Sequence, residues 1–256
     1  MKDPNEYNVR AVERALQILR CFDGEHPERG ISEIAQAVDL HKATAHRIVT
    51  TLVNYGYLER ADDGQKYRLG LELTNLGFKV LQRLDLRREA LPIMRQLTEE
   101  WDETCDLGIF DRGQVLYIEV VRGSRALNVA AAIGQTLPAH CTASGRALLA
   151  HLPDQEVNAV LSKPLTSYTT KTVTSPEEIR KELLTIRTQG YAVDMEGFEL
   201  GVCAIAAPIF NSRGRIIAAL GSPGPTSRMT PDRIRRMAAS FGEAARTISH
   251  RMGHQE

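Results

Sequence analysis

One segment of the chain carries cationic, imidazole and hydroxyl side chains at a spacing that places them on one face of a helix. Between residues 41 and 58 there is no acidic residue. Ala45, Ile48, Val49 and Leu52 form an apolar stripe at helical spacing, which predicts a helix over 41–54. The predicted contact residues on its remaining surface are Lys42, Ala43, Thr44, His46, Arg47 and Thr50. Such short and cationic donors suit hydrogen bonds with base edges in the major groove of DNA.

A predicted β-hairpin follows this helix and adds two cations. Residues 57–60 and 66–69 have strand-like sequences, and an Asp-Gly pair between them is a turn signal. Lys66 and Arg68 on the returning strand are therefore candidates for contacts with the flanking phosphates or the minor groove.

Two earlier helices complete a recognisable unit. Apolar spacing predicts helices over 10–22 and 31–38, and a tight turn at Asp39 leads into the helix over 41–54. Aspartate is one of the few non-glycine residues that tolerate a left-handed conformation. This order of elements predicts a winged helix–turn–helix. Residues 1–70 contain 10 Lys+Arg and 11 Asp+Glu, so the distribution of charge, and not its total, favours DNA over a merely solvated helix.

The whole chain has an ordinary globular composition. It has 256 residues, 43% of them hydrophobic, with 32 Lys+Arg against 32 Asp+Glu, and this length fits two domains. No apolar run is long enough to cross a membrane, and the first residues lack the apolar core of a secretory signal. We expect a cytoplasmic protein with free thiols, since none of its four cysteines is at C-x-x-C spacing.

The rest of the chain mixes strands with helices. Strand-like sequences occupy 107–110, 115–121, 127–130, 203–210 and 214–220, and helices are predicted at 89–102, 143–150, 175–190 and after 230. This mixture predicts an α+β domain with a mainly antiparallel sheet. Small residues at 140–145 lead into a helix and leave room for a ligand. The free backbone N–H groups at the start of such a helix attract carboxylates.

Over nearly its whole length the sequence resembles the IclR family of bacterial transcription regulators. The N-terminal segments that carry the resemblance are RAVERALQIL at 10–19 and KATAHR at 42–47. The C-terminal ones lie at 134–140, 143–150, 190–194, 199–202, 206–208 and 224–225. Their order and spacing together are specific. The sequence departs from the usual family pattern at Asp39, where glycine is common, and at His41, where proline or serine is common.

This resemblance implies an architecture and a function. We expect a winged helix–turn–helix over 1–72, a linker helix over 73–89, and a GAF-like α/β effector-binding and oligomerisation domain over 90–256. The implied function is a ligand-responsive repressor or activator of catabolic genes, acting as a homodimer or a dimer of dimers. Its partners would be a pseudo-palindromic double-stranded DNA operator and a small organic or aromatic acid. No cofactor, metal or membrane is expected.

The resemblance also indicates where an effector would bind. It places Ala143 and Ser144 in the pocket, Val129 over it, and Asp194, Val202, Ala204 and Gly221 on the opposite wall. Cys141 and Cys203 are further candidates for this pocket. By itself, Asp194 could equally be a surface or capping carboxylate.

The sequence also bears on three further questions, which are sensing by thiols or metal, catalysis, and the role of the linker arginines. The regulator could sense thiol oxidation or metal through Cys105, Cys141 and Cys203, although free cysteines are more often buried hydrophobic residues. An enzyme is not expected and no catalytic residue is assigned, because G-x-S-x-G, phosphate-loop and H-E-x-x-H motifs are absent. Arg83, Arg87 and Arg88 could contact DNA flanks or partner acids, or be simply solvated.

The first predicted helix and the linker carry more apolar surface than one small domain needs. The linker part of this surface is Leu76, Val80 and Leu84. We expect dimerisation there.

Overall fold

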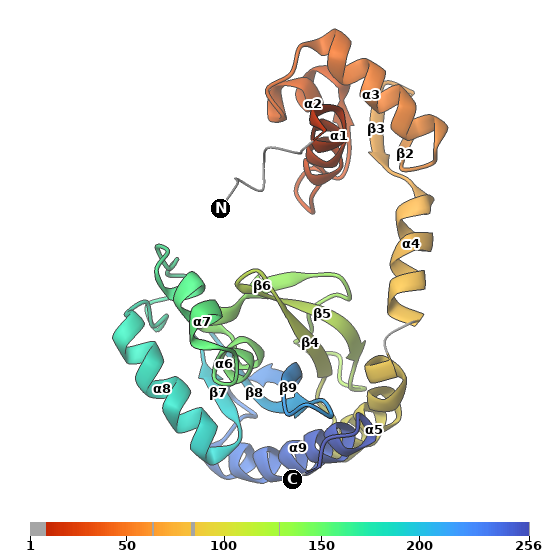
Figure 1. The fold of residues 1–256 in the computed structure, drawn as a ribbon. Helices are drawn as coiled ribbons and strands as arrows, with labels where there is room; N and C mark the ends of the chain where they lie inside the picture. Colours follow the sequence, from red (N-terminus) through yellow and green to blue (C-terminus); the bar gives the residue numbers. More distant parts are fainter. Residues whose placement is uncertain (1–8, 63, 83–84, 128, 256) are drawn as a thin grey trace. The chain divides into compact units, whose positions relative to one another are not determined.

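The computed structural model describes residues 9–62, 64–82, 85–127 and 129–255, and it divides the chain into two compact units, Met1–Arg83 and Leu84–Glu256 (Figure 1). The division lies within residues 73–89, where the sequence predicts one linker helix. Two helices occupy this stretch, α4 (Leu71–Gln82) in the first unit and α5 (Asp85–Trp101) in the second. The side chains of Val80, Arg83 and Leu84 lie outside the described residues.

Three helices and a small sheet form the body of the first unit. Its elements are α1 (Arg10–Arg20), β1 (Arg29–Gly30), α2 (Ile31–Ala37), α3 (Lys42–Asn54), β2 (Leu58–Arg60) and β3 (Lys66–Leu69). The strands are antiparallel in the order β1-β3-β2. Ile18, Ile34 and Val49 from the three helices are fully buried against one another. Asp39 has a φ of +49°, which confirms the left-handed turn predicted before α3.

The second unit is built on a six-stranded antiparallel sheet in the order β6-β5-β4-β9-β8-β7. Its strands are β4 (Cys105–Asp111), β5 (Gln114–Val121), β6 (Thr136–Pro138), β7 (Ala192–Met195), β8 (Val202–Phe210) and β9 (Ile216–Pro225). The strand predicted over 127–130 is wrong: Leu127, Val129 and Ala130 have irregular backbone, and Asn128 lies outside the described residues.

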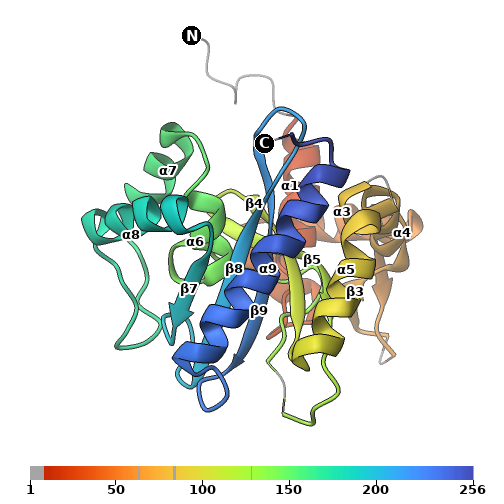
Figure 2. The ribbon, with the colours of Figure 1, turned by 90° about the horizontal axis from the view of Figure 1, so that it is seen from below.

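Helices lie on both faces of this sheet. On one face, α5 and α9 (Pro231–Arg251) run side by side across the strands (Figure 2). On the other face, α6 (Ala143–Leu149) packs on the central strands, α8 (Pro176–Gln189) packs against α6, and α7 (Asp154–Leu161) follows α6 in the chain. The predicted fold class, a winged helix–turn–helix followed by an α/β domain with an antiparallel sheet, is confirmed.

Local sequence explains how α6 and α8 are fixed. At α8, the Ser175 hydroxyl accepts a hydrogen bond from the Glu178 N–H at 3.3 Å, and Gly190 ends the helix at φ +80°, as the sequence predicts. At α6, Gly145 allows the helix to press against the preceding turn, because a Cβ there would lie 2.2 Å from the Ala139 carbonyl oxygen. This contact holds the start of α6 over the sheet.

Candidate DNA-binding surface and effector pocket

The α3 helix divides its residues between the core and the surface as the sequence predicts. Ala45, Val49 and Leu52 are buried. The predicted contact residues lie on the rest of the helix, where Lys42, Ala43, His46, Arg47 and Thr50 are exposed and Thr44 is half-buried. The structure therefore brings two cations, an imidazole and two hydroxyls onto the outside of one helix, in a form suited to a DNA groove.

The β2–β3 hairpin holds its two predicted contact residues differently. Lys66 is exposed. Arg68 is half-buried and forms ion pairs with three carboxylates. Its Nε lies 2.6 Å from Glu59 Oε1, and its other nitrogens lie 3.7 Å from Glu28 and Asp62. The bond with Glu59 raises the pKa of Arg68. This arrangement favours a structural role for Arg68, which ties the hairpin together, over the predicted phosphate contact.

A third cation of the same hairpin, Arg60, was not among the predicted contact residues. Its guanidinium lies 5.5 Å from the centre of the Tyr67 ring, and its Nη1 donates a 2.9 Å hydrogen bond to the Gly64 carbonyl. Arg60 and Tyr67 are paired across the two strands. That cross-strand pairing, readable from the hairpin register, is the signal that would have found it.

A cavity of about 120 Å³ lies inside the second unit. Of the predicted effector residues, Val129, Ala143, Ser144, Asp194, Val202 and Ala204 line it. Cys141 and Cys203 are fully buried but are not among its lining residues. The start of α6, the inner strands and the 129–137 segment thus meet around one enclosed space.

Four buried polar residues of this cavity were not predicted. They are Asp106 from β4, Tyr117 from β5, Ser222 from β9 and Thr142 at the start of α6. The Ser144 hydroxyl donates a hydrogen bond of 3.4 Å to Asp106 Oδ1, and burial raises the pKa of Asp106 to about 7. Burial also raises the pKa of Tyr117. A single acid inside an otherwise apolar strand is the signal that would have drawn attention to Asp106.

Gly221 contributes to the cavity through its missing side chain. It is paired with Asp106 across β4 and β9. A Cβ at Gly221 would lie 2.4 Å from Asp106 Oδ1 and 2.6 Å from Ser144 Oγ. Glycine at this position therefore makes room for the Asp106–Ser144 pair.

Asp194 combines the two roles that the sequence left open. It is buried and lines the cavity, and its Oδ2 accepts a 3.1 Å hydrogen bond from the Gly197 N–H. Burial raises its pKa, and the Arg146 guanidinium, whose Nη1 lies 4.0 Å from Asp194 Oδ1, opposes that shift. Arg146 is not among the residues that line the cavity, and its Nη1 pairs with Glu182 Oε2 at 3.0 Å.

The three thiols considered for redox or metal sensing are buried. Burial raises the pKa of Cys141 and Cys203 to about 12, and it raises that of Cys105 as well. Thiols with raised pKa are poor nucleophiles and poor metal ligands. Within the described ranges, no three His, Cys, Asp or Glu side chains gather as metal ligands would. The thiol and metal alternative receives no support.

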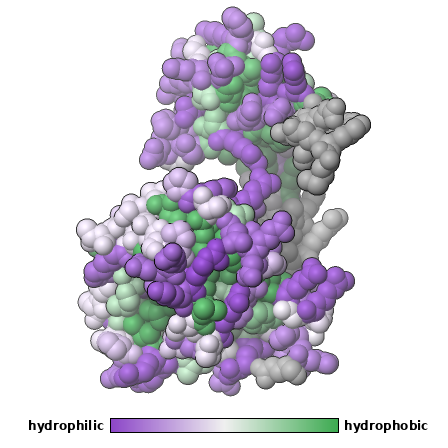
Figure 3. All heavy atoms as spheres, turned by 60° about the vertical axis from the view of Figure 1, so that its left-hand side comes forward, coloured by the Kyte–Doolittle hydropathy of each residue, from purple (hydrophilic) through white to green (hydrophobic). Residues whose placement is uncertain are grey.

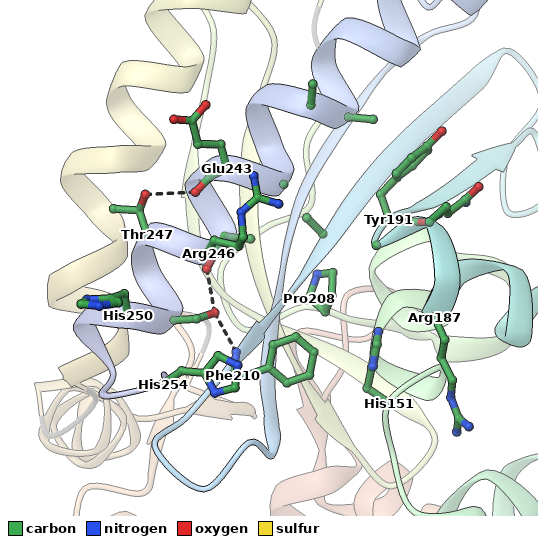
Figure 4. A pocket seen from close by; sticks show the side chains of 18 of the residues that line it. His151, Arg187, Tyr191, Pro208, Phe210, Glu243, Arg246, Thr247, His250 and His254 are labelled. Atoms are coloured by element: carbon green, nitrogen blue, oxygen red, sulfur yellow. Dashed lines mark hydrogen bonds between the residues drawn. The ribbon is translucent and has the colours of Figure 1, made fainter. Parts of the chain in front are cut away.

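A second depression, of about 1230 Å³, lies between α9, the end of α8 and β8 (Figure 4). It is open and has arginine and histidine side chains along it. The His151 ring meets Phe210 edge-on at 5.0 Å, and His254 lies 5.4 Å from the same ring. The Phe210 N–H donates to the Ser249 hydroxyl at 2.9 Å. These contacts give the rings a packing role.

Two linker arginines have partners within the second unit. Arg87 Nε lies 2.6 Å from the buried Glu119 Oε2, an ion-pair distance without hydrogen-bond geometry. Arg88 pairs with Asp85 at 3.2 Å and Glu89 at 3.3 Å. Of the alternatives left open for Arg87, simple solvation is therefore excluded.

Comparison with known proteins decides the family. The IclR helix-turn-helix domain model matches residues 11–62, and the model of the C-terminal domain of bacterial transcriptional regulator IclR matches residues 78–250. The chain belongs to the IclR family. Within the described part of this family member, no helix is long and apolar enough to cross a membrane.

Individual relatives match over almost the full chain. The HTH-type transcriptional regulator XynR of Escherichia coli K12 is 35% identical over 96% of this chain and 98% of its own. KdgR of Dickeya chrysanthemi is 36% identical over 99% of this chain and 83% of its own. A solved IclR homologue from Microbacterium hydrocarbonoxydans, complexed with 4-hydroxybenzoate, superposes with a TM-score of 0.83 at 32% identity, covering 94% of this chain and 98% of that one.

These matches confirm the functional expectation drawn from the sequence. The protein is a ligand-responsive, DNA-binding transcriptional regulator of the IclR family, whose members control catabolic genes, and it is not an enzyme.

Proposed function

We propose that the regulator reads its operator through α3, with Lys42, Arg47 and the neighbouring donors in the major groove. The exposed row of donors opposite the buried Ala45, Val49 and Leu52 supports this assignment. Lys66 on the hairpin adds a backbone contact outside the groove. Because α3 spans only a few base pairs, two copies on a pseudo-palindromic site supply the specificity.

The effector is a small organic acid that binds in the 120 Å³ cavity. The observation that carries this assignment is the convergence of buried polar groups, among them Asp106, Ser144, Asp194 and Ser222, on one cavity between apolar walls. The volume is small for a ligand pocket, so the ligand is compact. The 4-hydroxybenzoate bound by a structural relative is consistent with this class.

The working form is a homodimer that associates through α1. Val9, Val12 and Leu16 lie on one face of this helix or at its start and are all more than half exposed, at 64%, 56% and 54%. In Figure 3, hydrophobic atoms reach the surface between hydrophilic ones on both units. Burying the α1 face against a second copy removes this apolar surface from water and brings two α3 helices to one operator.

Selection of bound duplexes from a random DNA pool tests the proposal. It is run at about 0.15 M salt, where non-specific binding is weak. Wild type should enrich a pseudo-palindrome, and Lys42→Ala/Arg47→Ala should not. Enrichment of the same site by the double variant would contradict the assignment of α3. The selected duplex then serves to screen organic acids for release or recruitment of the protein.

A further inference from the structure

The chemistry of the cavity wall is unusual for a site that accepts an acid. Six polar residues that line it are more than nine-tenths buried: Asp106 at 3% exposure, Tyr117, Ser144 and Asp194 at 4%, Thr142 at 6%, and Ser222 at 1%. None of the described lining residues is lysine or arginine. A carboxylate ligand therefore enters a site that has carboxyl groups and hydroxyls but no cation on its wall.

Asp106 is short of hydrogen-bond donors. Among the described residues its side chain receives one hydrogen bond, from Ser144 at the long distance of 3.4 Å. A carboxylate offers about four acceptor positions, and a buried acceptor without a donor is costly. Gly221 adds no side chain that could donate to Asp106, and its missing Cβ leaves the room that Asp106 and Ser144 occupy. A donor brought by the ligand would satisfy this carboxylate.

The other carboxyl groups of the lining do not fill that need. Asp194 comes from β7 and Glu199 from the segment before β8, and both are acceptors when ionised. Tyr117 from β5 shares the Ser144 hydroxyl. The Ser222 hydroxyl is buried without a hydrogen-bond partner and is available to donate to the acid group of a ligand.

We propose that Asp106 is the specificity-determining residue of this pocket: it accepts a hydrogen bond from a hydroxyl group of the effector. The pocket then selects a hydroxylated acid over the same acid without the hydroxyl. This inference rests on the proposed effector site and specifies the chemical class that the site takes.

The test compares matched pairs of acids by calorimetry on the full-length protein, at a pH above the pKa of about 7 of Asp106, so that its carboxylate is ionised. The probes are lactate with propionate, malate with succinate, and 4-hydroxybenzoate with benzoate. For wild type, the hydroxylated member of at least one pair should bind about tenfold or more tightly than its partner, as a hydrogen bond to a charged group predicts. Equal binding within every pair that binds overturns the role of Asp106 and leaves the effector site standing.

The variant Asp106→Asn sharpens the test because it should change the preference within each pair. Loss of the negative charge favours both acids alike, but the neutral amide oxygen is a weaker acceptor than the carboxylate, so the preference for the hydroxylated acid should fall. General damage to the pocket would weaken both acids and would leave their ratio unchanged. Asp111→Asn is the matched control, since it removes an exposed carboxylate from the other end of the same strand.

Two further outcomes are decisive. Failure of both members of all three pairs to bind wild type contradicts the proposed effector class, and the inference falls with it. If Asp106→Asn does not fold, the comparison of pairs on wild type still decides the matter, since it uses no variant.

Discussion

At the residue scale, a buried carboxylate ties distant segments of the second unit together. Glu103 is 1% exposed, and Arg228 holds it with two parallel hydrogen bonds, Nε to Oε1 at 2.6 Å and Nη2 to Oε2 at 2.7 Å. Arg233 lies 3.4 Å from the same carboxylate. The pairing is bidentate and largely sheltered from water, so its loss leaves a buried charge with a weaker partner.

We therefore expect Arg228→Met to lower the free energy of unfolding by about 3 kcal/mol. Arg235→Met is the control: Arg235 pairs with Asp232 on the exposed start of α9, and its loss should cost at most about 1 kcal/mol. Urea unfolding of both variants measures the difference. Equal effects would mean that the Glu103 pair contributes no more than a surface pair.

Asp106 makes stability depend on pH. Its pKa is about 7 in the folded protein against an ordinary value of 3.8, because burial disfavours the charge. Between these values the folded state holds more protons than the unfolded state, so the free energy of unfolding falls as pH rises through this window. We expect Asp106→Asn to flatten the dependence of Tm on pH between about pH 4 and 7, and to raise Tm above it. Parallel Tm curves for the variant and wild type would contradict this assignment.

Sequence reasoning at this scale reached residues of the cavity where one segment supplied the information. Ser144 and Asp194, which line the cavity, were predicted because the family resemblance is local to their segments. Asp106 was missed because its place in the pocket depends on its register opposite Gly221, more than one hundred residues away. Arg68 was assigned to DNA because its partners Glu28 and Glu59 come from separate segments that only the fold brings together.

At the scale of elements, α3 gives a quantitative expectation for DNA binding. Replacing Lys42 or Arg47 by alanine should weaken binding to the selected operator, and each lost phosphate contact should reduce the slope of log K against log salt by about 0.9. Arg20→Ala removes a cation from the exposed end of α1 and should leave affinity nearly unchanged. Titrations at several salt concentrations measure both. An α3 variant that behaves like the Arg20 variant would remove that residue from the interface.

The α1 helix gives an expectation for assembly. Leu16→Glu places a charge in the exposed apolar face and should convert the dimer into a monomer, since an unpaired charge in an interface is costly. Because Leu16 is 54% exposed, the substitution should leave the fold intact. Gln17→Glu adds the same charge to an exposed position one residue along the helix and should leave the dimer. Sedimentation velocity distinguishes the two, and a dimeric Leu16→Glu would exclude this face as the interface.

Elements with their own end signals were predicted well. The serine cap and terminal glycine of α8 and the left-handed Asp39 before α3 are local chemistry, and the structure has each of them. The strand over 127–130 was predicted from apolar residues alone. In the structure Val129 and Ala130 are half-buried and line the cavity of the second unit outside any strand, so their apolar character reflects the cavity wall and not a sheet.

At the scale of the whole molecule, recognition of DNA and of effector belong to different units. The residues of α3 lie in the first unit, and every described lining residue of the cavity lies in the second. No single side chain serves both sites. The effector must therefore act by changing the equilibrium between arrangements of the units or of the two copies, which differ in affinity for the operator.

The most direct test of this coupling is the affinity of the full-length protein for its selected operator, measured by fluorescence anisotropy at about 0.15 M salt with and without the bound acid. We predict that saturating acid changes the operator Kd by about 5- to 150-fold, in either direction, the usual range for coupled sites. An unchanged Kd, with the acid shown by calorimetry to be bound, would contradict a ligand-responsive regulator that senses through this pocket.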